Sequence, residues 1–69
     1  NLYYLDIAYE ALPEDVYEKR PFDSFRIQYK KEVKLGDVVK CRYTFKDDEH
    51  IVSICNSDGS RVHAIIVLK

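Results

Sequence analysis

The first twelve residues constrain the fold of this 69-residue chain more than any other segment. Apolar side chains recur there at steps of three and four residues, the period of a helix, at Leu2, Leu5, Tyr9 and Leu12. Further apolar side chains extend this surface around a second face, at Tyr4, Ile7, Ala8 and Ala11. A helix that is apolar almost all round is buried. The pattern therefore predicts a long helix over residues 2–12 that the rest of the chain must wrap.

Pro13 ends this predicted helix, because proline lacks an amide hydrogen and disfavours the helical conformation at the residue before it. The Pro-Glu-Asp-Val run that starts at Pro13 suits a new helical turn, with acidic side chains near its positive end. Arg20 and Pro21 close the region. Residues 13–22 are therefore expected to form a short helical or looping connection.

Four segments then have the patterns of strands, over residues 24–33, 38–46, 50–56 and 61–68. The first two alternate, and their predicted inward side chains are Phe25, Ile27, Tyr29 and Val33, followed by Val39, Cys41, Tyr43 and Phe45. Turn signals separate the segments, and Gly59 in the last turn takes a positive φ without steric cost. The final segment carries the apolar run Ala64–Leu68 on both faces, so it should lie centrally in the sheet. One helix followed by an antiparallel sheet predicts an α+β fold, of which the hot-dog fold is one option.

Composition limits the classes of function. The net charge of −1 gives no general preference for nucleic acid, and the basic residues do not interleave with aromatic ones on one face. The apolar start carries Asp6 and Glu10 and is too short for a membrane span. Cys41 and Cys55 are read as reduced, half-buried residues of a cytoplasmic protein, and no zinc-like spacing indicates a metal or another cofactor.

Two blocks of the sequence resemble a known family when they are taken in one register. The segment Asn1–Pro13 resembles the helix of the acyl-acyl carrier protein thioesterases, in which an Asn-x-x-Tyr segment runs into a helix with a Glu and ends at a Pro. The segment Tyr29–Val39 resembles the later Tyr-x-x-Glu block of that family, which is followed by a Gly-Asp or similar turn and a Val.

The resemblance implies hydrolysis of the thioester between a fatty acyl chain and acyl carrier protein by two tandem hot-dog domains. This chain then corresponds to most of the second domain, and its predicted partners are the acyl carrier protein and the missing N-terminal hot-dog domain. The family's Asp-x-Asn-x-His motif would precede Asn1, so these groups cannot be assigned here. Glu32 matches the downstream active-site Glu, whereas Val33 stands where plant relatives carry a Cys. The resemblance thus favours water as the attacking group, with Asn1 and Tyr4 near the substrate.

Each candidate residue also has a simpler interpretation. Glu32 could be a solvated carboxylate at a strand end, although a carboxylate near a thioester can orient or deprotonate water. His50, which follows three acids in a loop, is expected to be solvated, and His63 is expected on the outer face of the last strand. Glu10 is expected to be a buried carboxylate that needs polar partners.

Positive charge on two strands and their turn suggests a docking face for an acidic carrier protein, with Lys30, Lys31 and Lys34 at its centre. The alternative is a solvated sheet face. Two alternatives to the enzyme itself also stay open: a hot-dog thioesterase that acts on acyl-CoA, and a non-catalytic half that shapes the acyl pocket or a dimer. Since the family's Asp-x-Asn-x-His motif would precede Asn1, this chain is expected to be inactive alone. Since so short a chain forms a small core, it is also expected to self-associate as a homodimer or larger assembly.

Overall fold

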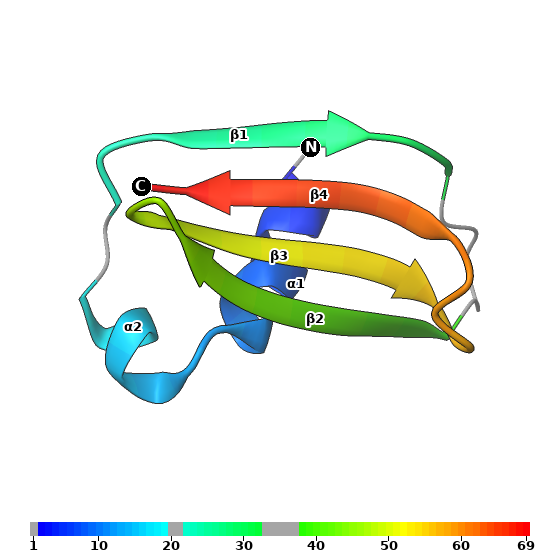
Figure 1. Ribbon diagram of the computed structural model, residues 1–69, viewed down its shortest axis with the longest axis horizontal. Helices are drawn as coiled ribbons and strands as arrows, with labels where there is room; N and C mark the ends of the chain where they lie inside the picture. Colours follow the sequence, from blue (N-terminus) through cyan, green and yellow to red (C-terminus); the bar gives the residue numbers. More distant parts are fainter. Residues whose placement is uncertain (1, 20–21, 33–37) are drawn as a thin grey trace.

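Two helices precede four strands in the computed structural model, which describes residues 2–19, 22–32 and 38–69 (Figure 1). The helices are α1 (Leu2–Ala11) and α2 (Glu14–Glu18), and the strands are β1 (Phe25–Tyr29), β2 (Val39–Lys46), β3 (Glu49–Asn56) and β4 (Val62–Leu68). The predicted α+β class is therefore confirmed, and three of the four predicted strands agree with the structure to within one residue at each end.

The four strands form one antiparallel sheet in the order β1-β4-β3-β2. Strand β4 lies between β1 and β3, which confirms its predicted central position. Its position suits its apolar sequence, because neighbouring strands cover both of its edges and α1 covers one of its faces. On the other face, Ile65 and Val67 are half-buried. Strands β1 and β2 form the two edges of the described sheet.

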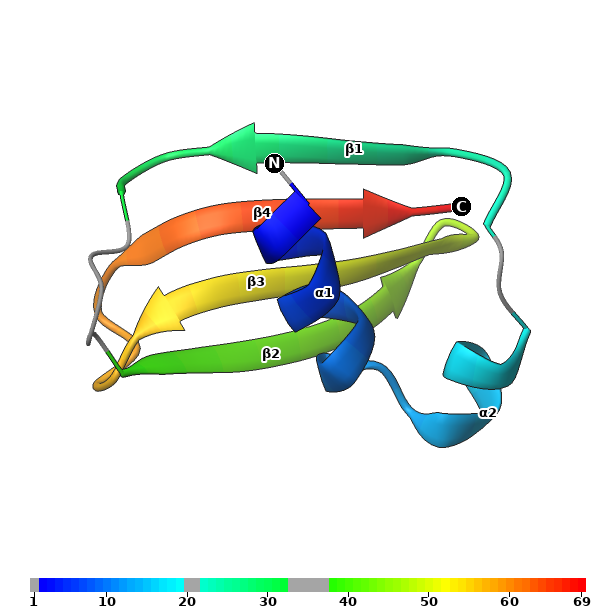
Figure 2. The same ribbon diagram turned by 180° about the vertical axis from the view of Figure 1, so that it is seen from behind.

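Helix α1 crosses one face of this sheet, and Figure 2 shows it passing over the strands at an angle. The side chains between the two layers are the core of the domain. From the helix they are Tyr4, Leu5, Ala8 and Leu12, and from the sheet Val52, Ile54, Ala64, Ile66 and Leu68. Leu5 and Leu12 are thus buried against the sheet and Tyr9 packs beside them, as the helical period predicted.

The sheet does not enclose the helix, and the prediction of a long, fully covered helix is not confirmed. Helix α1 has 10 residues and keeps one side in solvent. Asp6 and Glu10 share this side, because residues four apart lie on the same face of a helix. The expectation that Glu10 is buried is therefore wrong: its side chain is exposed and needs no buried partner.

The edge strands are less covered than their alternation suggested. Phe25 and Tyr29 of β1 are 57% and 51% exposed, and Phe45 of β2 is 55% exposed, although their side chains lie on the face that carries α1. The helix is only about 15 Å long at 1.5 Å per residue. It therefore covers the middle of the sheet and leaves the ends of the edge strands open.

Candidate functional site

The chain leaves the sheet just before the predicted catalytic Glu32. Strand β1 ends at Tyr29, four residues earlier than predicted. The amides of Lys30 and Lys31 then both donate to the carbonyl oxygen of His63, at 2.8 and 3.0 Å. Because two residues share one acceptor, the regular ladder stops there. Glu32 follows directly, outside the strand and exposed to solvent.

His63 is the extra residue of a bulge in β4. On the other side of β4, Ile54 pairs with Ala64 but Cys55 pairs with Val62, so His63 has no residue opposite it in β3. A bulge redirects side chains relative to simple alternation. His63 is consequently buried, with 6% of its surface exposed. The expectation that His63 lies on the outer face of the last strand is wrong for this reason.

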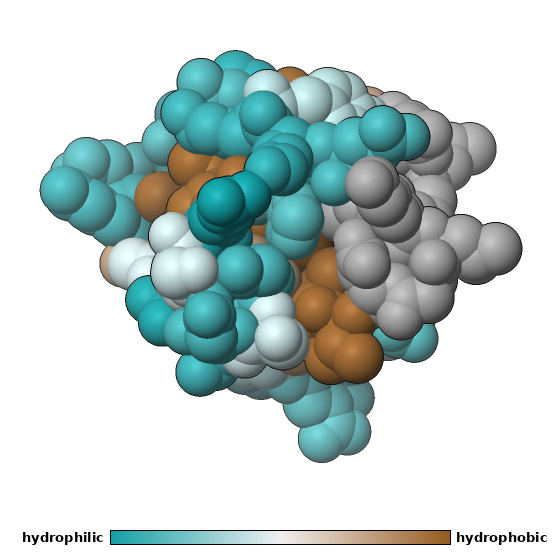
Figure 3. Space-filling view, turned by 90° about the vertical axis from the view of Figure 1, so that its right-hand side faces the viewer, coloured by the Kyte–Doolittle hydropathy of each residue, from teal (hydrophilic) through white to brown (hydrophobic). Residues whose placement is uncertain are grey.

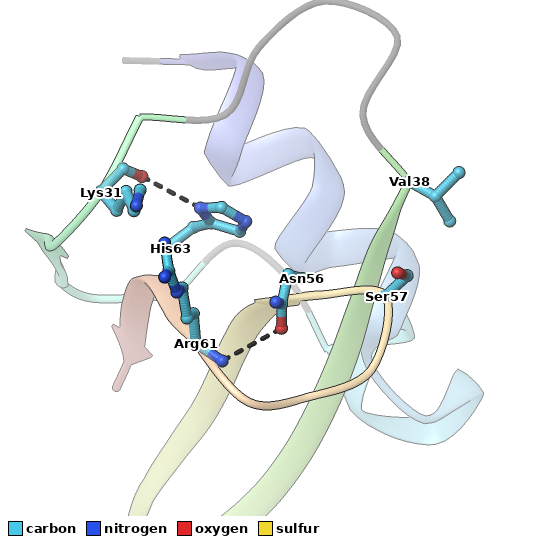
Figure 4. Close-up of a pocket in the computed structure, with 6 residues that line it drawn as sticks. All are labelled: Lys31, Val38, Asn56, Ser57, Arg61 and His63. Atoms are coloured by element: carbon cyan, nitrogen blue, oxygen red, sulfur yellow. Dashed lines mark hydrogen bonds between the residues drawn. The ribbon is translucent and has the colours of Figure 1, made fainter.

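The ring of His63 contacts the segment that precedes Glu32. Nδ1 of His63 lies 3.3 Å from the carbonyl oxygen of Lys31, a long hydrogen bond that Figure 4 marks. A carbonyl oxygen only accepts, so a hydrogen bond at this position requires the hydrogen on Nδ1. In Figure 4 the second ring nitrogen points away from Lys31, toward the space enclosed by the labelled residues.

That space is a polar pocket of about 270 Å³. It is smaller than the pockets that hold whole small-molecule ligands, roughly 300–1,000 Å³, so it suits water or one part of a larger substrate. Its described lining includes two cationic side chains and no carboxylate, and consists of Lys31, Val38, Asn56, Ser57, Arg61 and His63. The pocket therefore favours negatively charged or hydrogen-bonding groups.

The β3–β4 turn gives the pocket a fixed wall. Asn56 Oδ1 accepts from the Arg61 amide at 3.0 Å, and Asn56 Nδ2 donates to Ser60 Oγ at 3.2 Å. Asp58 accepts from the Ser60 amide at 2.8 Å, and its bonds to Ser60 lower the pKa of the Asp58 carboxyl. Figure 3 views this end of the molecule and shows mainly hydrophilic side chains with smaller hydrophobic areas between them.

A second histidine lies elsewhere in the structure. His50 belongs to β3, is half-buried, and bonds to the Tyr43 hydroxyl through Nδ1 at 2.7 Å. The prediction that His50 lies in a strand is confirmed, whereas the expectation that it is solvated is wrong. A tight turn precedes the strand. Asp47 and Asp48 have φ values of 53° and 62°, and a two-residue type I′ hairpin turn requires positive φ at both positions. Glu49 pairs with Lys46 directly after this turn, so the strand begins one residue before the predicted start at His50.

The two cysteines are free thiols, as predicted. Cys41 is half-buried and Cys55 is 2% exposed. Burial, together with the nearby Cys55 and Glu10, raises the pKa of the Cys41 thiol, so it stays protonated and is a poor nucleophile at neutral pH. Within the described residues, no group of three or more His, Cys, Asp or Glu side chains could hold a metal ion.

The structure brings some predicted site residues together and leaves others apart. Lys30 and Lys31 are exposed beside Glu32, at the pocket end of the sheet. Tyr4 is buried on α1, with its ring 5.2 Å from that of Tyr29 in an edge-to-face contact. Asn1, Val33, Lys34, Gly36 and Asp37 lie outside the described residues.

A further pocket, of about 430 Å³, lies between α1 and α2 and contains none of the predicted site residues. Its lining combines two carboxylates with aromatic and apolar side chains, from Tyr9, Glu10, Leu12, Glu14 and Tyr17.

Sequence analysis did not identify His63 or Arg61 as site residues. The signal available for His63 was weak: a single polar residue inside an otherwise apolar strand.

Comparison with family models finds one that covers nearly the whole chain. The model described as the acyl-ACP thioesterase C-terminal domain matches residues 1–66. No curated protein and no solved structure matches the chain. Neither helix of the described segments is long and apolar enough to cross a membrane.

Proposed function

The chain belongs to the acyl-ACP thioesterase family, and we propose that it supplies part of the site that releases free fatty acid from acyl carrier protein. The observation that supports this role most directly is the position of Glu32. It is exposed where β1 has ended, and it follows a segment fixed to His63 at the edge of a basic, polar pocket. The placement leaves its carboxylate open to a substrate.

The proposed reaction is hydrolysis of the thioester. Glu32 orients a water molecule and accepts its proton as the water oxygen attacks the carbonyl carbon. The carbon–oxygen bond forms, the carbon–sulfur bond breaks, and the departing sulfur takes up a proton. The products are a fatty acid and the thiol of the carrier. No thiol nucleophile adjoins Glu32 in the sequence, because position 33 is Val, and the protonated state of Cys41 argues against that thiol as a substitute.

Other groups complete the proposal. Asn1 and Tyr4 contribute to substrate binding, and Lys30, Lys31 and Lys34 attract the acidic carrier protein. The exposure of Lys30 and Lys31 next to Glu32 supports this arrangement. We also infer a hot-dog architecture, in which α1 and its sheet form most of the second of two tandem domains of a cytoplasmic enzyme. Alone, this chain would be inactive and would self-associate.

The test is Glu32→Gln in the full-length protein, because this change keeps the shape of the side chain and removes its charge. We expect turnover of acyl-ACP to fall by about 10²-fold or more, the scale typical of acid–base groups. Glu18→Gln on α2 is the matched control, since Glu18 is also exposed but lies outside the candidate site. It should leave turnover unchanged.

Both variants should keep the melting temperature of the wild type. A folded Glu32→Gln enzyme with near-normal turnover would show that Glu32 is only a surface carboxylate. The same assay with acyl-CoA separates the two thioesterase classes. A higher kcat/KM for acyl-CoA than for acyl-ACP would show that the substrate is acyl-CoA and that the proposed carrier is wrong. No turnover of either substrate by the wild type would instead favour a non-catalytic domain.

A further inference from the structure

We propose that His63 is a positioning residue for thioester hydrolysis: it fixes the main chain immediately before Glu32. This inference rests on the proposed role of Glu32. The hydrogen bond from His63 Nδ1 to the Lys31 carbonyl oxygen does not involve the reacting atoms. It acts through Lys31, the residue that precedes Glu32 and is 32 positions away from His63 in the sequence.

Three hydrogen bonds tie the segment before Glu32 to this one residue. The His63 carbonyl oxygen accepts from the amides of Lys30 and Lys31, at 2.8 and 3.0 Å. The His63 ring donates from Nδ1 to the carbonyl of Lys31, at 3.3 Å. Main-chain and side-chain groups of His63 therefore hold both polar groups of the Lys31 backbone. Glu32 would otherwise follow the last pair of β1 with no such anchor.

The ring bond is the part that depends on the side chain being histidine. Any residue at position 63 supplies a carbonyl oxygen, but few can donate to Lys31 from inside a strand. His63 is buried, and a buried polar ring is costly unless it is hydrogen-bonded. The bond to Lys31 meets this requirement. It also requires the hydrogen on Nδ1, while the other ring nitrogen faces the pocket (Figure 4).

The position of a catalytic carboxylate matters on the scale of one ångström. A displacement of that size can lower a rate by about 10²-fold even when the changed residue is not part of the chemistry. Loss of the Nδ1 bond would allow the Lys31 carbonyl group to rotate, and the main chain that continues to Glu32 would change direction with it. Substrate binding, by contrast, would change little.

Two amide substitutions in the full-length enzyme separate the roles of the two ring nitrogens. The amide nitrogen in His63→Asn takes a place near that of Nδ1, whereas the amide in His63→Gln reaches the place of Nε2. We expect His63→Asn to retain kcat close to that of the wild type. His63→Gln should lower kcat by about 10- to 100-fold with little change in KM.

His50→Asn and His50→Gln are the matched controls, because His50 also bonds through Nδ1 but does so to Tyr43. Both should leave kcat unchanged. Nitrogen-15 NMR of the imidazole ring gives a readout that does not depend on activity: wild-type His63 should carry its hydrogen on Nδ1 at neutral pH.

Three results would overturn the proposal. His63→Gln could keep wild-type kcat in an enzyme that Glu32→Gln inactivates. Both His63 variants could lose the same share of activity, each with a lowered melting temperature, which would indicate a purely structural residue. The ring could also carry its hydrogen on Nε2. An active Glu32→Gln enzyme is a different failure, since it removes the proposed function and leaves nothing for His63 to position.

Discussion

The hydroxyl of Tyr43 and Nδ1 of His50 lie 2.7 Å apart on the face of the sheet that carries α1. Their rings also stack, with centroids 6.0 Å apart and an angle of 21° between the planes. The rings of Phe45 and Phe22 contact His50 as well, at centroid distances of 4.8 and 5.7 Å. The pair is therefore the polar centre of an aromatic cluster at the end of the sheet opposite the candidate site.

Tyr43→Phe tests the contribution of this pair to stability. The change removes only the hydroxyl and leaves Nδ1 of the half-buried His50 without its partner. We expect the free energy of unfolding in urea to fall by about 1 kcal/mol, the usual contribution of one hydrogen bond. A double-mutant cycle with His50→Leu isolates the interaction. If the two changes prove additive, the bond does not contribute to stability.

The core gives a larger expected effect. Ile54 is fully buried between the sheet and α1, so Ile54→Ala should lower the free energy of unfolding by about 2–5 kcal/mol. Ile51 is the control, because it lies in the same strand on the opposite face and is only half-buried. Ile51→Ala should cost clearly less. Equal losses in chemical denaturation would mean that α1 does not cover Ile54 in solution.

How far the sequence predicts the fold depends on whether a feature is local. The extent of α1 and of β2, β3 and β4 could be predicted, because helical period, alternation and turn residues are encoded within each segment. The early end of β1 and the burial of His63 could not. Both arise where Lys30 and Lys31 meet His63, and simple alternation along β4 contains no sign of that pairing.

The candidate site shows the same division. Glu32 was singled out by a resemblance to a family, and its neighbours Lys30 and Lys31 by their charge. Neither source indicated that a histidine from β4 lies against this segment, since the contact joins residues 32 positions apart. Glu10 illustrates the opposite case. Its exposure depends on which side of α1 faces the sheet, and a helix with apolar residues on two faces leaves that choice open.

The pH dependence of stability should reveal the environment of Cys41. Burial is the largest cause that raises its pKa above the ordinary value of 9.0, followed by the nearby Cys55 and Glu10. A raised pKa means that folding favours the protonated thiol. The resulting stability is fully present below pH 9.0 and is lost as the pH rises through the higher folded-state value.

Cys41→Ser should therefore reduce the loss of stability that begins above pH 9.0, measured as the unfolding midpoint against pH. Tyr43 also has a raised pKa, from an ordinary value of 10.0 and mainly through burial, so its contribution should persist in this variant at higher pH. An unchanged profile in Cys41→Ser would show that the Cys41 thiol is no more buried than in the unfolded chain.

The last prediction concerns the attraction of the carrier protein to the basic end of the sheet. Lys30→Glu, Lys31→Glu and Lys34→Glu are combined in the full-length enzyme, because several charges act together in steering an acidic partner. We expect kcat/KM for acyl-ACP to fall by about 10-fold or more at low salt. Small thioesters, which carry no acidic protein, should be hydrolysed as before. The dependence on ionic strength should also flatten, since screening then has little attraction left to weaken.

A second triple variant controls for the change in net charge. Lys19, Lys46 and Lys69 are exposed near the opposite end of the sheet, where β2 ends and the C-terminus lies (Figure 1). Reversal of these three charges to Glu alters the net charge by the same amount but leaves the candidate docking face intact. It should lower kcat/KM for acyl-ACP much less. If kcat/KM for acyl-ACP falls equally in both triple variants, attraction of the carrier protein depends on overall charge and not on this face. If the first variant loses activity on small thioesters as well, these lysines support folding or catalysis instead of docking.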